Sequence, residues 1–230
     1  MALILSLLAV PPQAGAQDVR GIGGPDAGAF RTDRLSPRQL RIWMAIRKVV
    51  LASDAEGRAL YPTLCGLWRT VEQSGHQVFI ELITDREKSS NMAAECVVEN
   101  LDPAGRTHAI RVRLYIATID RAWGGEQAPQ DGLEFVPFAG LKHEKRYAKV
   151  LGHELTHVAN MLRDPDYLRL VQEICLEQRT IAAGRGADGW PLSAEALKER
   201  WARIWPLVSQ TDKPALAAER QIYRELLAGK

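Results

Sequence analysis

Residues 144–162 constrain the fold of this chain most strongly, because they combine a helical apolar pattern with two histidines on a different face. The apolar positions recur every three or four residues and predict a stripe that must be buried against other elements. They are Leu151, Leu155, Val158 and Leu162. His153 and His157 are four residues apart, so on a helix they lie one above the other, away from this stripe. The segment therefore predicts a helix whose histidines face whatever packs over it.

Weaker patterns surround this helix and predict an α+β fold. Strands are expected at 76–84, 95–100 and 107–119, of which the last alternates apolar and polar residues most regularly. Further helices are expected at 36–51, 54–71, 166–183, 193–205 and 213–227. The Gly- and Pro-rich segment 121–140 reads as a long loop. We therefore expect a small antiparallel or mixed sheet packed on the helix at 144–162, followed by a mainly helical C-terminal half.

The N-terminal residues are typical of an export signal. Ala2–Val10 are all apolar except Ser6, and Ala14-Gly15-Ala16 after two prolines fits a signal-peptidase site. We interpret residues 1–16 as a signal peptide, 17–35 as a flexible leader and 36–230 as a single domain. The alternative is a short buried helix or strand at the start of the fold. Export would place the protein in the periplasm or outside the cell.

Composition narrows the function classes. The chain has 30 Lys and Arg against 28 Asp and Glu, a balance that argues against a nucleic-acid partner. No apolar run approaches the roughly 20 residues that span a bilayer. In an oxidising compartment Cys65 and Cys96 can pair, but three cysteines leave at least one free thiol, and Cys175 reads as a small core residue.

Residues 153–157 form the pattern His-Glu-x-x-His, which predicts a catalytic metal site. On one helical face both imidazoles can reach a single ion. Glu154 lies about 100° further round the helix, beside the ion, where it suits a general base. Zn²⁺ is the expected occupant, because imidazole and carboxylate ligands with one open position describe a catalytic zinc. The alternative is an ordinary helical glutamate between two solvated or buried histidines.

This motif, behind an alternating strand and a long loop, resembles the zincin superfamily of metallopeptidases, over residues 107–230. The resemblance implies zinc bound by His153 and His157, a metal-bound water activated by Glu154, and cleavage of peptide or protein substrates. A strand parallel to the helix would hold the peptide. Asn160 and Asp164 stand where the metzincin extension has glycine and a third histidine, so a carboxylate is the implied third ligand, as in gluzincins.

Three glutamates are candidates for the third ligand. Glu173 and Glu177 follow on the next predicted helix, where they can equally be solvated. Glu219 is preferred, because it lies in the middle of the apolar face of the last predicted helix. A carboxylate there is costly unless a cation meets it, and that cation can be zinc or a buried arginine.

The remaining assignments are weaker. Tyr223 is the preferred donor to a developing oxyanion, with Tyr147 as the alternative, although each can be a core or rim tyrosine. Arg111 and Arg113 can meet substrate carboxylates or lie on a solvated sheet face. Besides a zinc peptidase, two other functions remain: a non-catalytic zincin-like binding domain of an envelope assembly, and a zinc amidase acting on cell-wall cross-links. The presence of Glu154 favours the catalytic alternatives.

Overall fold

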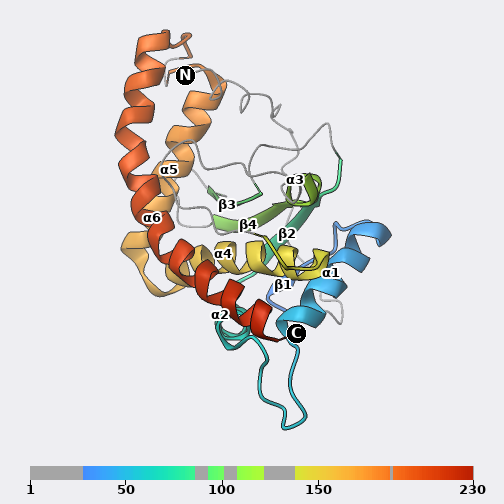
Figure 1. Ribbon diagram of the computed structural model, residues 1–230. Helices are drawn as coiled ribbons and strands as arrows, with labels where there is room; N and C mark the ends of the chain where they lie inside the picture. Colours follow the sequence, from blue (N-terminus) through green and yellow to red (C-terminus); the bar gives the residue numbers. More distant parts are fainter. Residues whose placement is uncertain (1–27, 86–92, 101–107, 122–137, 187–188, 230) are drawn as a thin grey trace.

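The computed structural model describes residues 28–85, 93–100, 108–121, 138–186 and 189–229 (Figure 1). The predicted signal peptide, residues 17–27 of the predicted leader and most of the predicted loop at 121–140 lie outside the described residues. In chain order the elements are β1 (Phe30–Arg31), α1 (Pro37–Val50), α2 (Pro62–Gln73), β2 (Val78–Ile83), β3 (Ala94–Asn100), β4 (His108–Tyr115), α3 (Ile116–Arg121), α4 (His143–Arg163), α5 (Pro165–Ala183) and α6 (Ala194–Ala228). The expected α+β fold with a helical C-terminal part is confirmed.

The strands form a mixed sheet in the order β1-β2-β4-β3. β1, β2 and β4 run parallel, and β3 pairs antiparallel with β4 at the edge. On β4, Val112 and Leu114 are fully buried, whereas Arg111 and Arg113 lie on the opposite face, as the alternating pattern predicts. The buried face therefore supplies the apolar surface on which the helices pack.

α4 lies at the centre of the fold, in contact with every other helix and with β3 and β4 (Figure 1). The predicted apolar stripe is buried, with Leu151, Leu155 and Val158 fully inaccessible to solvent. Gly152 allows α2 and α6 to approach closely, because a Cβ atom there would lie 2.4 Å from Cδ1 of Ile222. α4, the helix that carries the histidines, therefore packs closely against α2 and α6.

Local signals predict three helices to within two residues. Ser36 caps α1 through a capping box with Gln39, and Pro37 occupies the first turn, as expected from Ser-Pro. Asp164 ends α4 and caps α5, where its side chain accepts hydrogen bonds from the amides of Asp166 and Tyr167. Capping of this kind is readable from sequence because it involves neighbours in the chain.

Three expectations near the sheet are wrong in part. Phe30 and Arg31 belong to β1 instead of a flexible leader, because the Phe30 ring packs 4.0 Å from the ring of Trp68. The strand expected to reach residue 119 ends at Tyr115, and buried Ile116 and Ile119 share one face of the short helix α3. The helix expected from residue 54 begins at Pro62, so this proline lies in its first turn and not inside it.

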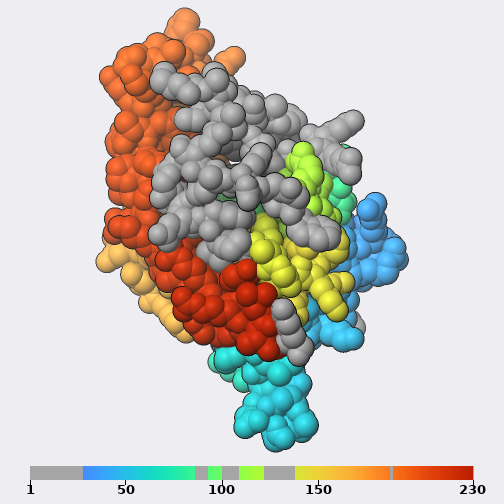
Figure 2. Space-filling view, viewed as in Figure 1, coloured from blue at the N-terminus to red at the C-terminus, as the bar shows by residue number. Residues whose placement is uncertain are grey.

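The two helices expected at 193–205 and 213–227 are one continuous helix, α6, with Pro206 and Pro214 inside it. Each proline removes one backbone hydrogen bond, but packing against neighbouring helices maintains the helix. α6 changes direction along its length (Figure 1), first running beside α5 and then beside α4 (Figure 2). This course carries residues 211–222 over the histidines of α4.

Cys65, Cys96 and Cys175 are all free thiols, so the pairing of Cys65 with Cys96 that an oxidising compartment would allow is not formed. Cys65 is buried in α2, whereas Cys96 lies on β3. Among the described residues, no helix combines the length and the apolar character needed to cross a membrane.

Candidate metal centre

Two histidines on successive turns of α4 point their ring nitrogens at one another. Nε2 of His153 lies 3.3 Å from Nε2 of His157, as the four-residue spacing predicts. His157 is buried, and the side chain of His153 is only 17% exposed. Both imidazoles therefore face the same small volume between α4 and α6.

Asp212 of α6 supplies a third donor atom to this volume. Its Oδ1 lies 3.4 Å from Nε2 of His157, and one ligand atom from each of His153, His157 and Asp212 lies within 4.8 Å of the others. Sequence reasoning missed Asp212, because it fell in the expected gap between two helices. Two imidazole nitrogens and one carboxylate oxygen are a suitable donor set for a transition-metal ion.

The far ring nitrogens of both histidines are held by hydrogen bonds. Nδ1 of His153 donates to Oε2 of Glu219 at 3.0 Å. Nδ1 of His157 lies 2.8 Å from the hydroxyl of Tyr167, which donates its own proton to the carbonyl of Thr211 at 3.2 Å and so accepts from His157. These bonds place the protons on Nδ1 and leave both Nε2 atoms to serve as donors to an ion.

Glu154 is a buried carboxylate beside this pair of histidines. It is 6% exposed, and no hydrogen bond to its side chain is present among the described residues. Burial raises its pKa above the ordinary value, although the charges of His153 and His157 oppose this rise.

The surroundings of His153 are rich in negative charge. Burial by itself lowers the pKa of His153, but three nearby carboxylates outweigh this effect and raise it to about 9. They belong to Glu219, Glu154 and Asp212. In the absence of an ion, the imidazole of His153 is therefore in its protonated, positively charged form at neutral pH. The same field favours a divalent cation, which would replace that proton.

Glu219 is buried in the apolar face of α6, as predicted, but the structure does not place it with the ligand atoms. Its Oε1 lies 2.8 Å from Nζ of Lys149, and its Oε2 contacts the far nitrogen of His153. These partners hold the pKa of Glu219 below its ordinary value against the effect of burial. The cation that meets this carboxylate is therefore a buried lysine, and the group of side chains that could hold an ion contains Asp212 and not Glu219.

The other two candidate ligands lie elsewhere. Glu173 is exposed on α5. Glu177 forms ion pairs with Arg200, at 2.6 Å, and with Arg203 of α6. The partners of Glu177 explain its position at the margin of the apolar stripe of α5 without a metal.

Neither tyrosine proposed as an oxyanion donor contacts the histidines. The hydroxyl of Tyr223 donates to the carbonyl of Ala139 at 2.9 Å, and that of Tyr147 donates to Oδ1 of Asp120 at 2.6 Å. Tyr167 is the tyrosine that the structure brings to the site, where it holds His157. Its place in the apolar stripe of α5 concealed this contact from sequence reasoning.

The arginines of the outer sheet face are also engaged within the protein. Arg111 pairs with Glu81 and Glu99, and Arg113 pairs with Glu81 and Glu95, at distances of 2.6–3.1 Å. Both arginines are therefore paired across the strands, and their side chains are only 15% and 26% exposed.

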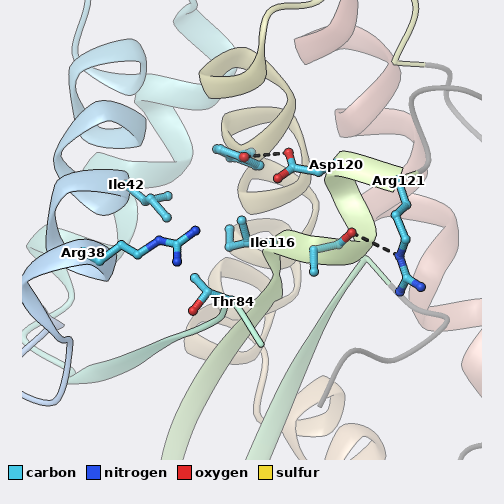
Figure 3. A pocket seen from close by; sticks show the side chains of 8 residues that line it. Arg38, Ile42, Thr84, Ile116, Asp120 and Arg121 are labelled. Atoms are coloured by element: carbon cyan, nitrogen blue, oxygen red, sulfur yellow. Dashed lines mark hydrogen bonds between the residues drawn. The ribbon is translucent and has the colours of Figure 1, made fainter. Parts of the chain in front are cut away.

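A hollow of about 330 Å³ lies between α1, α3 and the N-terminal half of α4 (Figure 3). Arg38 points into it, whereas Arg121 folds back onto the carbonyl of Ala117 on its own helix. None of the three converging ligand residues lines this hollow. The chemistry of the histidine pair is therefore separate from it.

Comparisons with protein-family models, with curated proteins and with solved structures found no match to this chain. The zincin resemblance therefore depends on the motif at 153–157 alone.

Proposed function

We propose that this protein is an exported, zinc-dependent peptidase whose ion is held by His153, His157 and Asp212. The fit is supported by the donor set, since two neutral imidazoles and one carboxylate leave a fourth position open, as catalytic zinc sites do. It is also supported by the hydrogen bonds on both Nδ1 atoms, which orient the rings for binding through Nε2.

Glu154 carries the catalytic part of the proposal. Its carboxylate is buried beside the histidines and has no hydrogen-bond partner among the described residues. A protein that only bound a metal or a partner would have no need for such a base.

Zinc, when bound, supplies a Lewis acid that polarises a substrate carbonyl and a water molecule. The proton transfers are then carried out by a residue of the chain. Glu154 accepts a proton from the attacking water on its carboxylate and returns it to the departing amine.

The peptide nature of the substrate rests on the zincin resemblance and on the position of β3. β3 is an edge strand of the described sheet and contacts α4. An extended peptide can add to such an edge through main-chain hydrogen bonds. The same chemistry applies to other amides, so cell-wall cross-links remain an alternative substrate.

Metal analysis of the purified protein and a peptide-library cleavage assay test the proposal together. Glu154→Gln should retain zinc and lose activity by a factor of about 10²–10⁴, because Gln cannot accept the proton. Glu173→Gln, an exposed glutamate on α5, is the matched control and should behave as the wild type. Full hydrolysis in Glu154→Gln would refute the role of Glu154 as the base, whereas zinc binding without any cleavage by the wild type would favour the non-catalytic binding domain.

A further inference from the structure

Lys149 is fully buried, which is unusual for a lysine and has no part in the chemistry described above. It lies one helical turn before His153 on α4, so both side chains occupy the same face. Its Nζ is 2.8 Å from Oε1 of Glu219, and 4.0 Å from the centre of the Phe138 ring. A buried ammonium group is stable only when paired, so Lys149 and Glu219 hold each other in place.

Glu219 uses its two oxygens for different partners. Oε1 accepts from Lys149, and Oε2 accepts from Nδ1 of His153. With only one of these bonds the carboxylate could rotate about its side chain. With both, its plane is fixed, and the His153 ring is fixed with it.

The order of these groups follows from the two antiparallel helices. Asp212 and Glu219 are seven residues apart on α6, so they lie within about 20° of the same face. Asp212 meets His157, and Glu219 meets both His153 and Lys149 on the preceding turn. Glu219, the carboxylate next to Lys149, therefore binds the far nitrogen of His153. Asp212 remains available to the ion.

We infer that Lys149 is a positioning residue of the metal centre, acting on His153 through Glu219. It keeps Glu219 on Nδ1, orients Nε2 towards His157 and leaves the ligand position to Asp212. The inference rests on the proposed metal site.

Zinc affinity, measured by competition with a chromophoric chelator, tests this arrangement. Lys149→Met should weaken zinc binding about 10–100-fold, the usual effect of losing a partner that orients a ligand. Lys149→Arg restores the charge and should recover most of the affinity. Lys145→Met is the matched control, since Lys145 is one turn earlier on α4 and bonds the carbonyls of Leu226 and Gly229 instead of Glu219.

A double-mutant cycle separates positioning from a general structural effect. If Lys149 acts through Glu219, Lys149→Met should cause no further loss of affinity in a Glu219→Gln background. Additive losses, an unchanged affinity in folded Lys149→Met, or an equal loss in Lys145→Met would overturn the inference. If Lys149→Met does not fold, Lys149→Gln, which keeps a polar side chain without the charge, takes its place in the same comparisons.

A measurement without metal distinguishes failure of this inference from failure of the proposed function. In the metal-free protein the Nδ1 proton of His153 should give a slowly exchanging, downfield NMR signal that Lys149→Met loses and Lys145→Met keeps. If the wild type binds no zinc but shows this pattern, the proposed function fails and the clamp by Lys149 stands. If zinc binds and the signal persists in Lys149→Met, the positioning role is refuted.

Discussion

Replacing Asp212 with alanine should show whether Asp212 or Glu219 is the third metal ligand. Asp212 is the residue whose Oδ1 converges with both Nε2 atoms, whereas Glu219 contacts only Nδ1 of His153. The aspartate side chain is a quarter exposed and its contact with His157 is 3.4 Å, so its loss should change the stability of the metal-free protein little. The change should therefore appear in zinc binding.

The losses of zinc affinity expected for Asp212→Ala and Glu219→Ala differ by about an order of magnitude. Structural zinc sites with four ligands bind with about 10–16 kcal/mol, or roughly 3 kcal/mol per ligand, so Asp212→Ala should weaken binding about 10²–10³-fold. Glu219→Ala removes a hydrogen bond to a ligand and should cost about 10–100-fold. Glu173→Ala, on the exposed face of α5, should cost nothing.

Thermal unfolding with and without zinc provides the assay. At a zinc concentration 100 times its Kd, binding stabilises the wild type by about 2.7 kcal/mol, which for a domain of this size raises Tm by roughly 5–10 °C. Asp212→Ala should lose most of this increase at the same zinc concentration. An undiminished increase in Asp212→Ala, or a loss in Glu173→Ala, would refute the assignment of Asp212.

Three further predictions concern stability. Gly152→Ala gains about 1 kcal/mol of helix propensity, but its Cβ would lie 2.4 Å from Ile222, and overpacking typically costs about 1–3 kcal/mol. We expect a Tm lowered by a few degrees; a higher Tm would contradict the close packing. Glu81 has a pKa held below 4.5 by its arginine partners despite burial, so its contribution is complete above pH of about 4.5 and is lost on further acidification. The fall in Tm between pH 6 and 3 should therefore be shallower in Glu81→Gln. Pro206→Ala restores a backbone donor at an exposed position inside α6 and should raise Tm; unchanged unfolding would indicate that the bend is set by packing alone.

The parts of the fold that could be predicted depend on neighbours in the chain. The Ser36 capping box and the cap at Asp164 give α1 and α5 their correct starts, and the spacing of His153 and His157 gives α4 its polar face. β1 could not be predicted in this way. Phe30 becomes part of the sheet because its ring meets Trp68, a contact between residues far apart in sequence.

The two prolines of α6 are the reason why Asp212, the third member of the candidate metal site, could not be predicted. Pro206 and Pro214 read as helix breakers, so Asp212 fell into an expected linker while Glu219 stood out in an apolar helical face. Once α6 is one helix, the same periodicity that identifies Glu219 places Asp212 two turns earlier on the same face. The apolar pattern therefore identified the face of α6 that meets the histidines, but of the two carboxylates on that face it indicated Glu219 and not Asp212. The choice between them is made by Lys149, a buried lysine whose partner depends on how α4 and α6 pack.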